Sequence, residues 1–490
     1  MIQGTGSHVG KSLLTAALCR IFTQDGYRVL PFKAQNMSNN AYVTKEGGEI
    51  GRAQAEQAKA CGVEPSVLMN PILLKPTTDV GAQVIVLGKA VGTMAARAYE
   101  EYKPQLLATI RQALQQLMEQ ADILLIEGAG SPAEINLKEG DLVNMWVAKH
   151  AQANVLLVGD IDFGGVFAQL VGTMELLDEE ERSLVRGFVI NKFRGDVTLL
   201  ESGIQWLEAR YGLPVVGVIP YFQDVELLEE DAVPQRKLDA RPLDRPIHIE
   251  VVRLPRISNF TDFAPLEQEP DVQLRYLERP STESLPDCLI LPGTKSTIAD
   301  LAFVRERGFD AYLRRCVEAG REILGICGGF QMLGQQILDP DHLEAAVNSA
   351  PGLGVLPAVA VFGKEKVVTQ VRGIHIESGL PIAGYEIHMG RMRHEPGSTA
   401  VFKFTERKDA GAESYDGLTT PDGRIWGTHL HGLFDVADFR RWWLNRLRRR
   451  NSLPGLPAGS ARSADGVYDR LAEAVRAHLN LKTIYQILEG

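Results

Sequence analysis

A glycine-rich stretch near the start of the chain has the residue types and spacing of a phosphate-binding loop. Residues 4–12 read GTGSHVGKS, and an apolar segment with a helical pattern follows to residue 22. Backbone N–H groups in such a turn converge on phosphate oxygens at the positive end of the helix. Lys11 would then reach the β- and γ-phosphates, and the Ser12 hydroxyl would bind Mg²⁺. The residues expected to hold ATP are Gly6, Ser7, His8, Val9, Gly10, Lys11 and Ser12.

The match to the usual loop spacing is imperfect, because the first glycine position is occupied by Thr5, with glycines on either side. A plain helix cap is therefore the alternative interpretation of this segment. Only three residues precede the loop, whereas a buried strand of about five residues normally does. Either the first strand is short or the natural chain starts upstream of Met1.

Two further polar residues follow apolar, strand-like runs in the same half of the chain. Glu127 ends the run at residues 121–126 and is followed by glycines, so its carboxylate is placed to meet Mg²⁺ directly or through water. Asn191 ends another run, where its amide could read the edge of a purine base. For each residue, an ordinary turn position at the end of a strand is the alternative.

A polar segment at residues 33–40 follows another predicted strand. Open α/β sheets bind ligands beyond the carboxyl ends of their strands. We therefore expect this segment to be a loop that contacts substrate or the transferred phosphoryl group through Lys33, Gln35 and Asn36. A solvated turn is the alternative, since Asn and Ser favour turns.

A second chemical centre lies in the other half of the chain, around Cys327. Residues 323–334 read ILGICGGFQMLG, which predicts a strand that runs into the cysteine and a helix that leaves it. The flanking glycines allow the sharp turn of a nucleophile elbow, in which the following backbone N–H groups can hold an oxyanion. The helix end also favours the thiolate. An inert core cysteine is the general alternative, and we assign that role to Cys19, Cys61, Cys288 and Cys316.

A thiol nucleophile requires a base, and the segment at residues 425–434, IWGTHLHGLF, supplies the best candidates. Alternation along a strand would put His429 and His431 on the same face, so one of them should meet Cys327. His388, within GYEIHMG at residues 384–390, is a weaker candidate that could instead belong to a binding surface.

The bulk composition limits the function classes. The 490 residues are 45% hydrophobic and 23% charged, which suits a globular protein of about two domains without a membrane span. A net charge of -10 argues against nucleic-acid binding and favours small-molecule partners. Five cysteines without CxxC spacing suggest neither zinc nor disulfides. We expect a cytoplasmic protein, since no secretory or transit segment is evident.

Predicted strands alternate with predicted helices along the chain, which indicates mostly parallel sheets with right-handed crossovers. Charges and prolines interrupt this rhythm between residues 229 and 245. We therefore predict an ATP-binding domain at 1–230, a linker at 231–246, a second α/β domain at 247–440 and a helical extension at 441–490.

With both centres in place, the chain resembles the cobyric acid synthases, glutamine-dependent amidases of cobalamin biosynthesis, over essentially its whole length. The resemblance rests on four stretches in this order: residues 33–40, SNFTDFAPL at 258–266, PGTKST at 292–297 and GYEIHMG at 384–390. It implies two doubly wound domains. The first is a P-loop domain of the dethiobiotin synthetase type, and the second is a flavodoxin-like, class I glutamine amidotransferase domain.

The resemblance also implies roles for individual residues. The family's nucleophile falls on Cys327 and its histidine on His431, because the family pattern Gly-Thr-aromatic-Leu-His-Gly puts His429 at the aromatic position. Backbone N–H groups near Gly293 and Gly328 would hold the oxyanion. Related amidotransferases have a Glu two residues after the histidine, where this chain has Leu433. A Cys-His dyad oriented by some other group is therefore implied.

The reaction implied is an ATP- and glutamine-dependent amidation. The acceptor would be adenosylcobyrinic acid a,c-diamide, whose b, d, e and g carboxylates become amides, and Mg²⁺ would accompany ATP without any tightly bound cofactor. A homo-oligomer is possible. The nearest alternative is the a,c-diamide synthase, which acts on the same ring. An alternative of another class is a partition or switch ATPase with a non-catalytic second domain.

Overall fold

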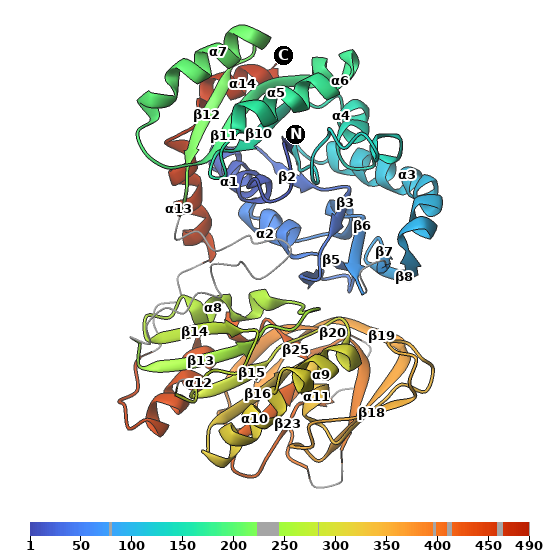
Figure 1. Cartoon of the computed structure of the whole chain (residues 1–490), viewed down its shortest axis with the longest axis vertical. Coiled ribbons are helices and arrows are strands. Elements are labelled where there is room, and N and C mark those ends of the chain that lie inside the picture. The colour runs from blue at the N-terminus through green and yellow to red at the C-terminus, as the bar shows by residue number, and fades with distance from the viewer. Residues whose placement is uncertain are drawn as a thin grey trace.

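The computed structural model describes residues 1–77, 81–222, 245–282, 284–394, 398–408, 414–457 and 464–489. The chain forms two α/β domains, one above the other in Figure 1. The predicted linker at 231–246 lies mostly within 223–244, outside the described residues.

The first domain is built on a parallel sheet. Strands β1, β10, β11 and β12 pair in that order, and β9, paired with β2, joins β1 through a parallel bridge between Glu127 and Ile2. Apolar runs form these strands because helices cover both faces of such a sheet. The strands are β1 (Ile2–Gly4), β2 (Val29–Phe32), β9 (Ile123–Ile126), β10 (Val155–Asp160), β11 (Val185–Phe193) and β12 (Val215–Pro220).

The helices of this domain alternate with the strands. They are α1 (Lys11–Gln24), α2 (Arg52–Ala60), α3 (Ala96–Met118), α4 (Met145–Ala151), α5 (Val166–Leu176), α6 (Glu179–Leu184) and α7 (Glu201–Tyr211). Short 3₁₀ turns are η1 (Val67–Met69), η2 (Lys138–Gly140) and η3 (Val197–Leu200). The glycine-rich loop follows β1, and Glu127 follows the neighbouring strand β9, so both lie at the carboxyl ends of the parallel strands.

A smaller sheet extends this domain toward the second one. Its strands pair in the order β3, β6, β7 and β8, beside a β4-β5 hairpin. The bounds are β3 (Gln35–Met37), β4 (Ala41–Val43), β5 (Glu49–Gly51), β6 (Ile72–Pro76), β7 (Gly81–Val86) and β8 (Lys89–Ala95). The prediction of a continuous loop at residues 33–40 was therefore wrong, because β3 pairs in parallel with β6.

The second domain has a mainly parallel sheet in the order β14-β13-β15-β16-β24-β23, with only β23 antiparallel to its neighbour. Its strands are β13 (Ile247–Val252), β14 (Val272–Leu277), β15 (Cys288–Leu291), β16 (Glu322–Ile326), β23 (Leu418–Thr419) and β24 (Ile425–Thr428). The associated helices and turns are η5 (Phe260–Phe263), α8 (Ala264–Glu267), α9 (Thr297–Glu306), α10 (Phe309–Glu318), α11 (Gly328–Leu333), η6 (Leu433–Asp435) and α12 (Ala437–Arg450). The predicted fold class, with two α/β domains, is confirmed.

A second, largely antiparallel sheet in this domain was not predicted. Its longest strands, β19 and β20, form a hairpin with a register shift between Phe362 and Val367. The strands are β17 (Gln336–Leu338), β18 (Ser349–Pro351), β19 (Ala358–His375), β20 (Pro381–His394), β21 (Phe402–Arg407), β22 (Ser414–Asp416) and β25 (Leu430–His431).

The segment predicted as one C-terminal extension contains helices that pack on different domains. Trp443 of α12 lies fully buried in the core of the second domain. By contrast, α13 (Ala464–Arg476) and α14 (Leu481–Glu489) lie beside the first domain in Figure 1. Arg20 of α1 pairs with Asp469 of α13 at 2.7 Å, so the chain returns to the domain where it began. Within the described ranges, no helix combines the length and apolar character needed to cross a membrane.

Candidate active site

The glycine-rich loop lies between β1 and α1, as its pattern predicted. Gly10 has a φ of +96°, a conformation that side chains disfavour, and α1 begins at the next residue. The Lys11 ammonium donates to the carbonyl oxygens of Gly6 at 2.8 Å and Gly130 at 3.1 Å. The lysine therefore folds back over its own loop, where a nucleotide phosphate would compete for it.

Glu127 gathers three side chains at the tip of β9. Its Oε1 accepts hydrogen bonds from the Ser12 hydroxyl at 2.8 Å and the Lys33 ammonium at 2.7 Å, and its Oε2 accepts one from Gln57 at 2.5 Å. Glu127 is fully buried, so its charge depends on these partners. Neighbouring carboxylate and hydroxyl oxygens are ligands that suit Mg²⁺, and the residues present therefore fit a magnesium-nucleotide complex.

Asn191 lies against the loop rather than beyond it. Its Nδ2 donates to the Val9 carbonyl at 2.8 Å, and a Cβ added at Gly10 would lie 2.1 Å from that nitrogen. Lys192 supports the same loop, with its ammonium 2.6 Å from the His8 carbonyl oxygen. These contacts show Asn191 bracing the loop, and its recognition of a purine edge stays a prediction.

Of the three residues predicted to contact substrate or phosphoryl groups, only Lys33 reaches the Glu127 cluster. Gln35 accepts a short hydrogen bond from the Tyr99 hydroxyl. Asn36 is buried and donates to Gln54 at 3.0 Å. Gln35 and Asn36 therefore form hydrogen bonds with other residues of their own domain.

Cys327 occupies the turn between β16 and α11. Its φ of +50° lies in the left-handed region that non-glycine residues rarely adopt, as expected for a strained nucleophile elbow. A Cβ at Gly329 would lie 2.0 Å from the Leu291 carbonyl oxygen, and one at Gly328 would lie 2.6 Å from the Thr294 side chain. Glycine is therefore required at both positions for the elbow to pack against β15 and the loop after it.

His431 meets Cys327 on one side and Asp262 on the other. His431 and Cys327 line the same cavity and interact electrostatically, and the His431 Nδ1 lies 2.7 Å from the Asp262 carboxylate. The Cys327 sulfur also lies 3.6 Å from the Ile387 carbonyl oxygen. Asp262 also accepts the Gly432 N–H at 3.0 Å, which fixes its orientation. The sequence pattern did not predict which group orients His431, although Asp262 lies inside the SNFTDFAPL stretch that carried the resemblance.

The protonation of the pair follows from its surroundings. Burial lowers the pKa of His431, but the Asp262 carboxylate and Cys327 outweigh it and raise that pKa to about 10. Burial raises the pKa of the Cys327 thiol, yet His431, His429 and the Gly328 N–H bring it below its ordinary value. The arrangement therefore favours a thiolate beside an imidazolium.

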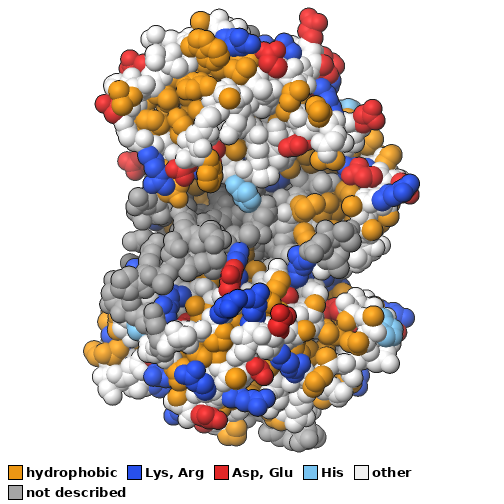
Figure 2. Space-filling view, viewed as in Figure 1, with side chains coloured by type: hydrophobic (Ala, Val, Ile, Leu, Met, Phe, Trp, Pro, Cys, Tyr) orange, Lys and Arg blue, Asp and Glu red, His pale blue; other side chains and the backbone are white. Residues whose placement is uncertain are grey.

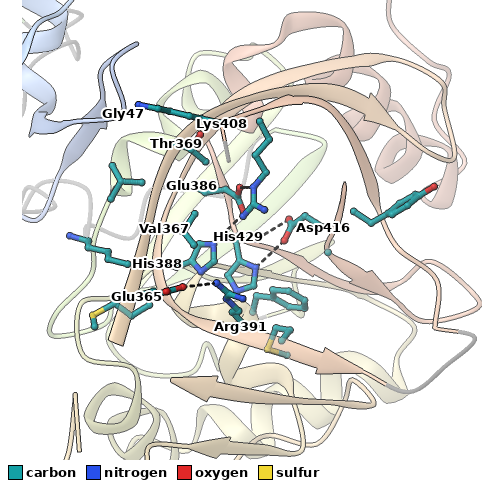
Figure 3. A pocket seen from close by; sticks show the side chains of 18 of the residues that line it. Gly47, Glu365, Val367, Thr369, Glu386, His388, Arg391, Lys408, Asp416 and His429 are labelled. Atoms are coloured by element: carbon teal, nitrogen blue, oxygen red, sulfur yellow. Dashed lines mark hydrogen bonds and ion pairs between the residues drawn. The ribbon is translucent and has the colours of Figure 1, made fainter. Parts of the chain in front are cut away.

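His429 belongs to a different cluster, shown in Figure 3. The chain leaves one sheet after β24 and enters the other at β25, with His429 between them. Its Nδ1 lies 2.9 Å from Asp416, and its ring stacks on His388 at 4.1 Å. His388 in turn lies 3.2 Å from Glu386. His429 lines a neighbouring cavity of about 1380 Å³, whereas His431 lines the cavity that contains Cys327, so the geometry favours His431 as the partner of Cys327.

The cavity next to Cys327 has a volume of about 500 Å³ and is lined by both domains. A Cβ added at Gly293 would lie 3.0 Å from the His431 ring, so glycine leaves room for the imidazole there. The second domain contributes Ser258, Asn259, Thr294, Lys295, Ser296, Thr297, Cys327, Gln331, Leu343, Glu344, Phe362, Lys366, Ile387, His388, Met389 and His431. The first domain contributes Lys75, Thr77, Gln83, Ala90, Val91, Gly92 and Thr93. Figure 2 shows this face of the molecule, on which many Lys and Arg side chains lie over the second domain, the lower one in the view.

Comparisons with known proteins agree with this arrangement. Residues 1–234 match the family described as CobQ/CobB/MinD/ParA nucleotide binding domain, and residues 248–439 match the CobB/CobQ-like glutamine amidotransferase domain. Fold, site and matches together define an enzyme that joins a nucleotide-binding domain to a glutamine amidotransferase domain.

Full-length relatives narrow the class to one family. A cobyric acid synthase from Pelotomaculum thermopropionicum is 50% identical over 504 residues, which cover 100% of this chain and 96% of the relative. One from Dehalococcoides mccartyi (strain CBDB1) is 48% identical, covering 100% and 98%. The solved structure of PurLQS from Thermotoga maritima covers 40% of this chain and 99% of its own, at 17% identity and a TM-score of 0.32. The chain belongs to the cobyric acid synthase family.

Proposed function

We propose that this enzyme amidates carboxylates with ammonia taken from glutamine, at the expense of ATP. The Cys327–His431–Asp262 arrangement, in the same chain as the Ser12–Glu127–Lys33 cluster, is the observation that carries the proposal. One centre releases ammonia and the other activates a carboxylate. Neither centre by itself could amidate a carboxylate with nitrogen from glutamine.

At the amidotransferase site, the Cys327 thiolate attacks the side-chain amide of glutamine. Backbone N–H groups near Gly293 and Gly328 hold the oxyanion, and His431 gives its proton to the leaving ammonia. Water then attacks the glutamyl thioester, losing a proton to His431, and releases glutamate and the thiolate. Asp262 keeps His431 oriented and stabilises its charged form throughout.

At the nucleotide site, a substrate carboxylate attacks the γ-phosphate of ATP and becomes an acyl phosphate, with ADP as the leaving group. Ammonia then displaces inorganic phosphate to form the amide. Lys11 and Lys33 neutralise charge on the transferred phosphoryl group, and Ser12 and Glu127 would hold Mg²⁺. Bound Mg²⁺ would offset the negative charge that develops on the phosphates.

The proposed acceptor is adenosylcobyrinic acid a,c-diamide, amidated at the b, d, e and g positions. This choice rests on the names of relatives that match the whole chain at 48–50% identity. Product analysis with each corrinoid tests it, since amidation at only the a and c positions would instead indicate an a,c-diamide synthase.

The experiment that tests the function compares glutamine-dependent with ammonia-dependent turnover on the wild type and on Cys327→Ala. We expect the substitution to abolish the use of glutamine while amidation driven by ammonia continues. A wild type with ATPase activity but no glutaminase activity would overturn the proposal in favour of a switch ATPase with a non-catalytic second domain.

A further inference from the structure

Two buried asparagines, one from each domain, form a reciprocal pair of hydrogen bonds across the domain interface. Asn40 Oδ1 of the nucleotide-binding domain accepts the Phe260 N–H at 3.1 Å. In return, Asn259 Oδ1 of the amidotransferase domain accepts the Ala41 N–H at 3.1 Å. Each side chain therefore bonds to the backbone beside its counterpart, and both are almost fully buried.

Each half of this pair is itself held in place. The Asn40 N–H donates to the Ser38 hydroxyl at 3.0 Å, and the Asn40 carbonyl accepts the Arg52 N–H at 3.0 Å. Asn259 has a φ of +51°, which asparagine tolerates better than most residues. A displacement of Asn40 would therefore be felt directly by the turn that begins at Phe260.

That turn carries the acid of the amidotransferase site. Phe260 opens η5 and lies two residues before Asp262, whose carboxylate orients His431. The Asp262 N–H donates to the Asn259 carbonyl at 2.9 Å, which closes the turn. Asn259 Nδ2 also lies 3.4 Å from the hydroxyl of Tyr385, whose ring stacks on His431 at 5.6 Å. The interface therefore borders the histidine on two sides.

We propose that Asn40, a residue of the nucleotide-binding domain, is a positioning residue for the glutaminase reaction of the other domain. By holding the backbone of η5, it fixes the Asp262 carboxylate against His431 and so maintains the Cys327–His431 ion pair. The amidotransferase centre is thus completed across the interface. This inference rests on the proposed glutaminase function.

The charges around the pair determine what loss of Asn40 would do. Asp262 from η5 and the Cys327 thiolate face His431 directly, and Tyr385 from β20 covers its ring. His429 adds charge near Cys327, while Arg52 from α2 and Asp435 from η6 interact electrostatically with Asp262. If Asp262 moves away, the pKa of His431 falls, less imidazolium faces the sulfur, and the pKa of Cys327 rises.

The test uses the full-length enzyme with Asn40→Ala, and Ser38→Ala as a milder change to the same turn. The rate of Cys327 alkylation by iodoacetamide and glutaminase kcat are measured across pH. In Asn40→Ala we expect glutaminase kcat to fall at least about tenfold at pH 7. The apparent pKa of the thiol should rise by roughly one unit. Ser38→Ala should shift both in the same direction by less.

Gln370→Ala is the matched control. Gln370 of β19 donates across the same interface to the Val43 carbonyl at 2.8 Å and the Tyr42 hydroxyl at 3.3 Å, so its hydrogen bonds hold the β4 strand rather than the backbone of η5. This variant should keep the wild-type pH profile. An unshifted profile in a folded Asn40→Ala or Ser38→Ala enzyme would overturn the inference, as would an equal shift in Gln370→Ala, which would indicate general loss of domain docking. Absence of glutaminase activity in the wild type would instead overturn the proposed function.

Discussion

The two chemical centres of this protein differ in how their groups are satisfied before any substrate binds. At the nucleotide site, Ser12 and Lys33 both bond to one oxygen of Glu127, and Lys11 bonds to the carbonyls of Gly6 in its own loop and of Gly130 after β9. The polar groups are thus paired with one another. A magnesium-nucleotide complex must exchange some of these bonds for its own, so we expect this site to rearrange on binding.

At the amidotransferase site the reacting groups are already ordered. His431 lies between Cys327 and Asp262, and burial strengthens the electrostatic interactions among these three groups. The comparison shows that activation of the nucleophile is built into the fold, whereas activation of the carboxylate waits for a ligand. Substitutions at the nucleotide site should therefore lower amidation with either glutamine or ammonia as the nitrogen source. Substitutions at the amidotransferase site should lower only the glutamine-dependent reaction.

The sharpest separation of the two sites comes from Cys327→Ala. Without the sulfur no thioester can form, so glutamine-dependent turnover should fall by roughly 10⁴-fold or more. Ammonia-dependent amidation should stay near the wild-type rate, because the nucleotide site is intact. Cys316→Ala, which removes a fully buried cysteine of α10, is the control and should retain both activities. Equal loss of both activities in Cys327→Ala would contradict the division of labour.

The next largest effect is expected for Asp262→Asn. Loss of the carboxylate charge removes the main support for imidazolium at His431, so glutaminase kcat should fall about 10²–10⁴-fold. Asp416→Asn is the matched control, because its carboxylate bonds to His429 instead. Glutaminase assays on both variants, with thermal melts to verify folding, decide between the two histidines. A larger loss in Asp416→Asn would identify His429 as the base.

Glu127→Gln should lower amidation with either nitrogen source by about 10²-fold, because a charged oxygen near the phosphates is lost while the side-chain shape is kept. Glutaminase activity measured alone should persist. Glu175→Gln, at an exposed ion pair with Arg210, serves as a surface control. If only glutamine-dependent turnover declined in Glu127→Gln, the assignment of this cluster to the nucleotide would be wrong.

The smallest effect is a shift in pH dependence. Since His431 lowers the pKa of Cys327, alkylation of the thiol should stay fast at pH values below the ordinary thiol pKa of about 8.5. In His431→Gln, burial remains and the imidazolium is gone, so the apparent pKa should rise above that value. Rates of iodoacetamide labelling from pH 5 to 10 provide the measurement, and identical profiles would show that no ion pair exists.

The same pair has a signature in stability. The pKa of His431 is raised to about 10 in the folded protein, above its ordinary value of about 6.5. Its contribution to the free energy of unfolding is therefore full below pH 6.5 and is lost as pH rises through 10. The difference in stability between wild type and His431→Gln should shrink over that range in denaturant titrations.

Local patterns were sufficient for the parts of each site that lie within one stretch of chain. The glycines around Cys327 predicted its turn, and the lysine and serine at the end of the first loop predicted where α1 begins. Glu127 was singled out because a carboxylate at the tip of an apolar run beside such a loop is placed to meet Mg²⁺. In the structure its carboxylate lies 2.8 Å from Ser12.

Groups brought together only by the fold were harder to predict. Asp262 and His431 are 169 residues apart, and the position where related enzymes place their acid holds Leu433. The strands β19 and β20 were missed because charged residues such as Lys364 and Lys366 interrupt their alternation at a register shift. The bond from the Asn191 amide nitrogen to the Val9 carbonyl could not be predicted either, because it depends on strand register rather than residue type.

The return of the C-terminal helices makes the nucleotide-binding domain discontinuous, with the whole amidotransferase domain inserted before its last two helices. Phe22 of α1 lies 5.6 Å from the ring of Tyr485 in α14, and Leu471 of α13 shares its core. A cut between the domains would therefore not yield two complete proteins. The first fragment would expose an apolar face of α1, and the second would carry helices without a core, so functional halves would have to reassociate by fragment complementation.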